Sequence, residues 1–222
     1  MEEISELQTI LGTALDQGII TQWAALIVGI IYVILAAKEN IWCWPVGIIS
    51  VILAFIVYID PKVRLYSDAG LQVFYLGMSI YGWWNWRRAG NEQSENNVLD
   101  NLASDSTGVL PITEWPVQKH LLTIFIGIGL ALLMGWIWSL TNADLPFIDA
   151  ITSAFSVIAT IMVAQKVLEN WLYWIIINFA CIFIYAYKGV YLFCLLFFIY
   201  MVVAIFGYLN WRRKYAFQQT AN

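Results

Sequence analysis

The stretch GWWNWRR at residues 82–88 is nearly repeated as GYLNWRR at residues 207–213, 125 positions further along the chain. A second pair of similar stretches lies earlier in each copy. ENIWCW at residues 39–44 aligns with ENWLYW at residues 169–174, with an offset of 130 positions. The chain therefore contains an internal duplication, and a duplication of this kind determines how the remaining segments are grouped.

The composition around these motifs is that of an integral membrane protein. Of the 222 residues, 61% are hydrophobic and only 12% are charged, whereas soluble domains carry about 25% charged residues. Seven apolar runs are about long enough to cross a bilayer as helices. We predict these spans at residues 19–37, 41–59, 69–84, 121–138, 148–163, 171–187 and 192–208.

Each copy of the duplication holds three of these spans, and one span lies between the copies. Three spans per copy would invert the second copy, so a single connecting helix keeps the copies parallel. We therefore expect an all-α membrane fold of three plus one plus three helices, a plan in which transporters bind substrate between the repeats. The expected segments are an acidic N-terminal segment (1–18), a first repeat (19–86), a linker (87–118), a connecting helix (119–140), a second repeat (148–211) and a tail (212–222).

Basic residues are distributed unequally over the two sides of the membrane. Because basic loops remain in the cytoplasm, the larger group predicts a cytoplasmic linker and C-terminus, with the N-terminus outside. The acidic start of the chain does not resemble a signal peptide, and the polar linker is typical of a flexible segment. The larger group is Lys38, Arg87, Arg88, Lys119, Lys166, Arg212, Arg213 and Lys214, and the smaller is Lys62, Arg64 and Lys188.

The spans lack the groups on which enzymes and proton-driven carriers depend. No acidic or basic side chain is expected deep in a span, and the one histidine, His120, is expected at the membrane interface. Coupling through side-chain protonation is therefore not expected, although Na⁺ coupling through backbone carbonyls stays open. No catalytic residue, metal site, cofactor or nucleic-acid partner is expected, and the three cysteines, Cys43, Cys181 and Cys194, are expected to be small apolar residues.

The remaining polar and aromatic groups inside the spans are the candidates for a substrate site. In the third and sixth spans they follow the spacing of one helical face. Ile48 stands where the alignment would place a partner for Asn178, so the two copies differ in polar groups. Amides can instead hold helices together, but a lining of rings and amides fits a nucleoside or vitamin, and best a flat cation. The candidates are Trp44, Gln72, Tyr75, Ser79, Gln165, Trp171, Trp174, Asn178 and Tyr185.

Three motifs in order, ENIWCWPVGIISV (39–51), LYSDAGLQVFYLGMSIYGWWNWRR (65–88) and ENWLYWIIINFACIFIYAYKGVYLF (169–193), resemble the PnuC family of nicotinamide riboside transporters. The resemblance covers nearly the whole chain outside the linker and tail. It implies a fold similar to SWEET transporters, in the lipid of a bacterial inner membrane and often as a homotrimer. It also implies uptake of nicotinamide riboside by facilitated diffusion, with trapping by a cytoplasmic riboside kinase.

The same resemblance assigns binding roles to particular residues. Gln72 and Tyr75 match an LQxxY segment of the family, and Trp174 and Asn178 match a WxxxN segment. Similar proteins exist for other vitamins of thiamine or riboflavin type, so such a substrate is the alternative within the transporter class. A membrane receptor or scaffold that does not transport is the alternative from a different class.

Overall fold

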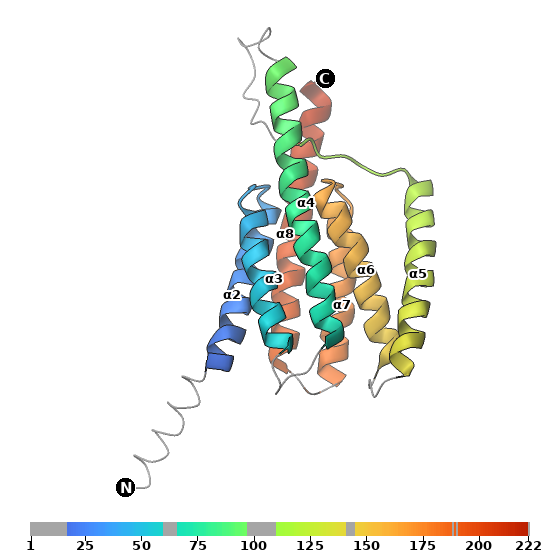
Figure 1. The fold of residues 1–222 in the computed structure, drawn as a ribbon. Coiled ribbons are helices and arrows are strands. Elements are labelled where there is room, and N and C mark those ends of the chain that lie inside the picture. The colour runs from blue at the N-terminus through green and yellow to red at the C-terminus, as the bar shows by residue number, and fades with distance from the viewer. Residues whose placement is uncertain are drawn as a thin grey trace.

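The computed structural model describes residues 17–59, 66–96, 110–140, 145–187, 189 and 191–221. Expectations for the acidic start of the chain, the middle of the linker and the basic residues Lys62, Arg64 and Lys188 therefore lie outside the described residues. The described segments form α2 (Gln17–Ala37), α3 (Cys43–Ile59), α4 (Tyr66–Asn96), α5 (Val117–Ser139), α6 (Pro146–Ala164), α7 (Asn170–Tyr187) and α8 (Tyr191–Ala221) (Figure 1).

Most of these helices are apolar over a length that suits a bilayer. Five contain segments long and apolar enough to cross one, while α3 is equally apolar but shorter. The chain is therefore an all-helical, multi-pass membrane protein. The five segments are Ile20–Ala37, Val117–Ser139, Pro146–Ala164, Asn170–Tyr187 and Phe193–Thr220.

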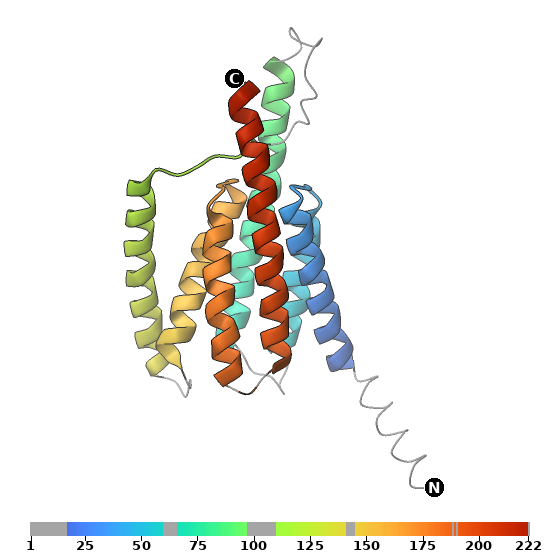
Figure 2. The same ribbon diagram turned by 180° about the vertical axis from the view of Figure 1, so that it is seen from behind.

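Six of the described helices pack side by side in a closed ring. In order around it, α2 contacts α3, α3 contacts α4, α4 contacts α6, α6 contacts α7, α7 contacts α8, and α8 returns to α2. Among the described helices, α5 packs against α6 alone and stands outside the ring in both views (Figures 1 and 2). Each ring helix therefore turns one face toward a shared interior.

Two ring helices continue beyond the spans expected from the sequence. α4 reaches Asn96, whereas the linker was expected from residue 87, and α8 runs through the expected tail to Ala221. Neither extension contains proline, and their Arg, Ala, Gln and Glu residues favour helix. The extensions project together from one end of the ring (Figures 1 and 2). We call this end, where α8 finishes, the C-terminal end.

The last part of the linker, residues 110–116, is packed against the ring rather than flexible, and we call it the strap. The Thr113 N–H donates to the Lys166 carbonyl over 3.0 Å, and the Leu168 N–H donates to the Thr113 carbonyl over 2.8 Å. Ile112 is buried in the main apolar cluster. Backbone pairing and an apolar anchor thus fix the strap to the turn between α6 and α7, which corrects the expectation of flexibility for this part.

α2 ends in a Schellman turn that has no glycine. The Asn40 N–H donates to the Leu35 carbonyl over 2.9 Å, and the Glu39 N–H donates to the Ala36 carbonyl over 3.0 Å. Glu39 has a left-handed backbone with φ of 59°. Glycine is usual at this position, because a Cβ costs about 1–2 kcal/mol in the left-handed region. Glutamate therefore occupies the turn against its local backbone preference.

α6 ends in the same turn, 127 positions later. Lys166 is the left-handed residue, with φ of 55°. Its N–H donates to the Val163 carbonyl over 3.0 Å, and the Val167 N–H donates to the Met162 carbonyl over 2.9 Å. Lys166 is therefore the structural counterpart of Glu39.

This offset corrects the alignment of the two copies. Trp44 and Trp171 are equivalent, because each is the second residue of its helix, whereas the sequence alignment paired Trp44 with Trp174. The alignment followed the repeated Glu-Asn dipeptide. In the structure, however, the first glutamate is the left-handed residue of its turn and the second lies three residues past the left-handed Lys166.

Candidate substrate cavity

The inward faces of the six ring helices enclose a cavity of about 230 Å³. Every ring helix contributes to the wall, and none of the described lining residues comes from α5. Five of the candidates named from the sequence line this cavity: Tyr75, Ser79, Trp171, Trp174 and Asn178. They come from α4 and α7, the two helices on which a polar and aromatic face was recognised. Asn178 is only 3% exposed, so its amide is buried at the centre of the protein.

Two aromatic candidates lie away from the described cavity wall. Trp44 is fully buried and meets Trp86 edge-on, with ring centroids 5.2 Å apart and an interplanar angle of 89°. Tyr185 stacks on Phe193 and Phe197, with centroids 5.1 and 5.2 Å away. Helical spacing placed both residues on the correct face, but their neighbours fill the space in front of them.

Two amide candidates also lie elsewhere. Gln72 lines a separate apolar pocket together with residues of α3. Gln165 caps the C-terminus of α6, and its backbone N–H donates to the Ile161 carbonyl over 3.0 Å. Neither amide is among the described residues of the main cavity wall.

The cavity wall includes residues that the sequence analysis missed. Tyr32 on α2 and Tyr200 on α8 bring aromatic rings from helices in which no candidate had been named. Gly47 admits the first ring, since a Cβ there would lie 3.0 Å from Tyr32 Cδ2, and Gly29 admits the Tyr200 hydroxyl at the same distance. One signal was available in the sequence, because Tyr75 and Tyr200 share the offset of 125 positions.

The lining residues fall into structurally equivalent pairs with different side chains. Three pairs have a small or apolar residue in α2–α4 and a polar or aromatic residue in α6–α8, and one pair is reversed, so the two walls differ in chemistry. Val51, rather than Ile48, is the counterpart of Asn178. A cavity of this kind suits a molecule whose two ends differ. The pairs are Val33 with Thr160, Gly47 with Trp174, Val51 with Asn178, Ser79 with Ala204, and the symmetric pair Tyr75 with Tyr200.

The cavity is aromatic and uncharged. Among the described residues that line it, none carries a charge, while tyrosine, tryptophan and phenylalanine rings come from four helices. Ring faces attract cations, whereas an anion in such a site would lie in a low-dielectric interior with no positive partner. The lining therefore favours a neutral or cationic ligand.

Four buried tryptophans pack together between the cavity and the C-terminal end of the ring. Trp171 meets Trp211 edge-on at 5.4 Å, in the same arrangement as Trp44 with Trp86, and Trp86 lies 6.1 Å from Trp211. All four side chains are at most 2% exposed. We call these residues the tryptophan cluster. It fills the interior at this end.

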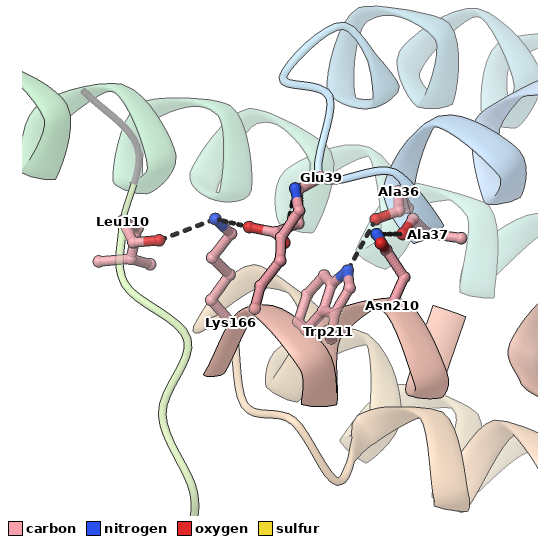
Figure 3. A network of polar contacts seen from close by, with 8 residues as sticks. Ala36, Ala37, Glu39, Leu110, Lys166, Asn210 and Trp211 are labelled. Carbon is pink, nitrogen blue, oxygen red and sulfur yellow. Dashed lines mark hydrogen bonds and ion pairs between the residues drawn. The ribbon is translucent and has the colours of Figure 1, made fainter. Parts of the chain in front are cut away.

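Polar contacts between α2–α4 and α6–α8 surround the tryptophan cluster. The Asn85 amide donates to the Ala164 carbonyl over 2.9 Å. The equivalent Asn210 amide donates to the Ala37 carbonyl over 2.8 Å. The Trp211 indole N–H donates to the Ala36 carbonyl over 3.2 Å (Figure 3). The contacts thus run in both directions between the two sets of helices.

A buried ion pair completes this end. The Lys166 ammonium lies 2.7 Å from Glu39 Oε2 and donates to the Leu110 carbonyl of the strap over 2.8 Å (Figure 3). Lys214 lies 3.1 Å from the other Glu39 oxygen. Lys166 is only 1% exposed; burial lowers its pKa, while the Glu39 carboxylate acts in the opposite direction. The sequence analysis had counted Lys166 among the basic residues of one membrane side and had used Glu39 only to align the two copies.

The family to which the chain belongs follows from its sequence similarity. The model of the family described as "Nicotinamide mononucleotide transporter" matches residues 19–213. The chain belongs to this family. The nicotinamide riboside transporter PnuC of Escherichia coli (strain K12) is similar to this chain. The two proteins are 31% identical over 197 residues, and the match covers 83% of this chain and 82% of the relative.

A second relative of this chain is named for a different vitamin. The riboflavin/roseoflavin transporter RibM of Streptomyces davaonensis is 23% identical over 190 residues, covering 83% of this chain and 81% of RibM. The fold is also similar to that in a crystal structure of the vitamin B3 transporter PnuC, with a TM-score of 0.69 and 20% sequence identity between the two chains. The match covers 95% of this chain and 88% of that chain. The fold is therefore that of a solved transporter, and the relatives are transporters rather than enzymes.

Proposed function

We propose that this chain transports nicotinamide riboside across the membrane. The observation that carries the proposal is the uncharged, aromatic cavity shared by six packed helices. Nicotinamide riboside has a flat pyridinium cation at one end and a neutral ribose at the other. The ring faces suit the cation, and the hydroxyl and amide groups suit the sugar. The relatives named for nicotinamide riboside support the same substrate.

The charge of the lining argues for the riboside over the mononucleotide in the family's description. A phosphate group carries nearly two negative charges at neutral pH, and no described lining residue is basic. Lys166, the one buried cation among the described residues, is already paired with Glu39. The nucleotide would therefore leave its phosphate unpaired in a low-dielectric interior.

We assign binding roles to the residues that line the cavity. Trp174 supplies a ring face to the pyridinium, and Asn178 hydrogen-bonds the carboxamide or ribose. Tyr75 and its counterpart Tyr200 approach from α4 and α8, and Tyr32 adds a further ring from α2. Of the residues that lie elsewhere, Gln72 and Trp44 would reach a substrate only after the helices move.

We further propose that α2–α4 and α6–α8 are two parallel repeats of SWEET-like arrangement, joined by α5. The reciprocal amide bonds and the matching tryptophan pairs support this view. Rocking of the repeats would expose the cavity to each side in turn, giving facilitated diffusion. A cytoplasmic riboside kinase would trap the product, because its added charge is rejected by the uncharged cavity. The exposed apolar side chains of α5 would contact lipid or other subunits of a homotrimer.

Liposomes that contain only this protein test the proposal. Labelled nicotinamide riboside should enter until its concentrations inside and outside are equal at zero membrane potential, and an imposed H⁺ or Na⁺ gradient should not change this end point. A riboside kinase and ATP sealed inside should raise total uptake well above it. Excess unlabelled nicotinamide riboside should compete, whereas nicotinamide mononucleotide should not.

Three results would contradict parts of this proposal. Accumulation driven by H⁺ or Na⁺ alone would exclude facilitated diffusion. Flux of labelled riboflavin or thiamine, without flux of labelled nicotinamide riboside, would transfer the proposal to another vitamin. No flux of any of these compounds, with the protein correctly folded, would favour a receptor or scaffold.

We also propose a bacterial inner-membrane location with the C-terminal end of the ring in the cytoplasm. Lys38, Lys119 and Lys166 belong to the helix ends and turns of this end, and Arg87 and Arg212 begin the extensions of α4 and α8. Basic residues remain on the cytoplasmic side. Alkaline phosphatase, which is active only in the periplasm, should be inactive when fused after Asn222. Green fluorescent protein at the same position should fluoresce, and the reverse pair of results would invert the orientation.

A further inference from the structure

The contacts between α2–α4 and α6–α8 at the C-terminal end include one that is ionic. The ion pair of Glu39 and Lys166 joins the turn after α2 to the turn after α6. Lys166 also donates to the strap through the Leu110 carbonyl, and the strap is bound to the same turn through Thr113. One lysine thus links both sets of helices and the segment that crosses this end (Figure 3).

The backbone geometry indicates that these two side chains serve the interface rather than their own turns. Both residues are left-handed, and glycine would relieve that conformation at each position. The side chains therefore contribute nothing that favours the local turn. What they contribute is the 2.7 Å contact across the interface.

An ion pair is also a contact that can open without a large penalty. Burying two opposite charges costs hydration, which offsets most of their attraction and leaves a small net gain from the contact. When the pair separates into water, each charge regains its hydration. An apolar contact at the same place would instead expose its surface to water on opening. Glu39 and Lys166 are therefore suited to an interface that must close and open repeatedly.

We infer that Glu39, Lys166 and the strap form a lock that holds the C-terminal end of the cavity closed and separates whenever substrate passes this end. The tryptophan cluster beneath them is the barrier, and the ion pair holds the two sets of helices together over it. Opening would separate Glu39 from Lys166 and break the Asn85 and Asn210 bonds. This inference rests on the proposed transport function.

Reversible cross-linking tests the lock. In a chain with Cys43, Cys181 and Cys194 replaced by alanine, Glu39→Cys and Lys166→Cys are introduced together. A bifunctional methanethiosulfonate reagent then links the two positions, and dithiothreitol releases them. The linked protein in liposomes should lose nearly all flux of nicotinamide riboside and recover it after reduction. Each single-cysteine variant, treated with the same reagent, should keep the flux of its untreated form.

A second measurement follows the opening directly. Cys43 is fully buried beside Trp44, so its alkylation by a maleimide, with Cys181 and Cys194 replaced by alanine, reports access from this end. Glu39→Gln should raise the alkylation rate about tenfold, as expected for loss of one charge-assisted hydrogen bond. Asp149→Asn is the matched control. Asp149 lies in the first turn of α6, at the end of that helix opposite Lys166, and its replacement should change the rate less than about twofold.

The outcomes separate the lock from the transport function. Full flux in the linked protein, or equal alkylation rates in Glu39→Gln and Asp149→Asn, would show that the pair is only structural and would overturn the inference. Absence of nicotinamide riboside flux in the unmodified protein would instead overturn the proposed function. Retained binding of nicotinamide riboside by the linked protein would show that the link blocks passage without unfolding the cavity.

Discussion

Replacing Gly82 with alanine is expected to destabilise the protein more than the same replacement at any other described glycine. An ideal Cβ at Gly82 would lie 2.2 Å from the Trp44 indole, closer than non-bonded atoms approach. Trp44 is fully buried against Trp86, so the ring has no free space into which to move. Overpacking of this kind costs about 1–3 kcal/mol or more, and we expect the melting temperature in detergent to fall by roughly 4–10 °C.

The matched control lies in the same helix. A Cβ at Gly77 would meet nothing within 4 Å, and alanine favours a helix over glycine by about 1 kcal/mol. Gly77→Ala should therefore keep or slightly raise the melting temperature. Gly207→Ala, whose Cβ would lie 2.8 Å from Trp171, should be intermediate. Equal melting temperatures for Gly82→Ala and Gly77→Ala would show that the tryptophan cluster yields easily.

Replacing Asn178 with leucine is expected to weaken binding of nicotinamide riboside about 5- to 150-fold. Leucine has a similar volume but cannot hydrogen-bond, and loss of a buried polar partner costs about 1–3 kcal/mol. Quenching of tryptophan fluorescence on titration with nicotinamide riboside measures the affinity, because Trp171 and Trp174 line the same cavity. Phe179→Leu changes the next residue, which is 54% exposed on the outer face, and should leave the affinity unchanged.

Thermal unfolding of the same two variants distinguishes the roles open to the amide. A binding residue should lose affinity with little change in melting temperature. If Asn178→Leu instead lowers the melting temperature and leaves the affinity unchanged, the amide holds helices together, and the binding role is wrong.

The parts of the site that the sequence predicted depend on one helix at a time. Helical spacing alone places Trp171, Trp174 and Asn178 on a single face of α7, and all three line the cavity. The apolar runs likewise predicted where most helices lie, because the length and hydrophobicity of a span are local properties. Helix extensions beyond the apolar runs, as in α4 and α8, leave no such signal.

The parts that escaped prediction depend on how helices meet. Trp44 has the right spacing, yet Gly82 on α4 provides the space that receives its ring, away from the cavity. Tyr32 reaches the cavity only because Gly47 on α3 leaves room for it. The Glu39–Lys166 pair joins residues whose equivalence appears only in the geometry of two turns. None of these relations follows from periodicity within one span.

Glu39 and Lys166 occupy equivalent places in their turns, and this limits how such a contact could arise. In a homodimer of identical three-helix chains, a two-fold axis would bring each residue near its own copy. Two glutamates or two lysines at that point would repel each other. An attractive contact between equivalent positions requires that the two halves differ in sequence, which a single chain encoding both halves allows. On the proposed two-repeat architecture, α5 supplies the covalent connection that lets the halves diverge while they remain parallel.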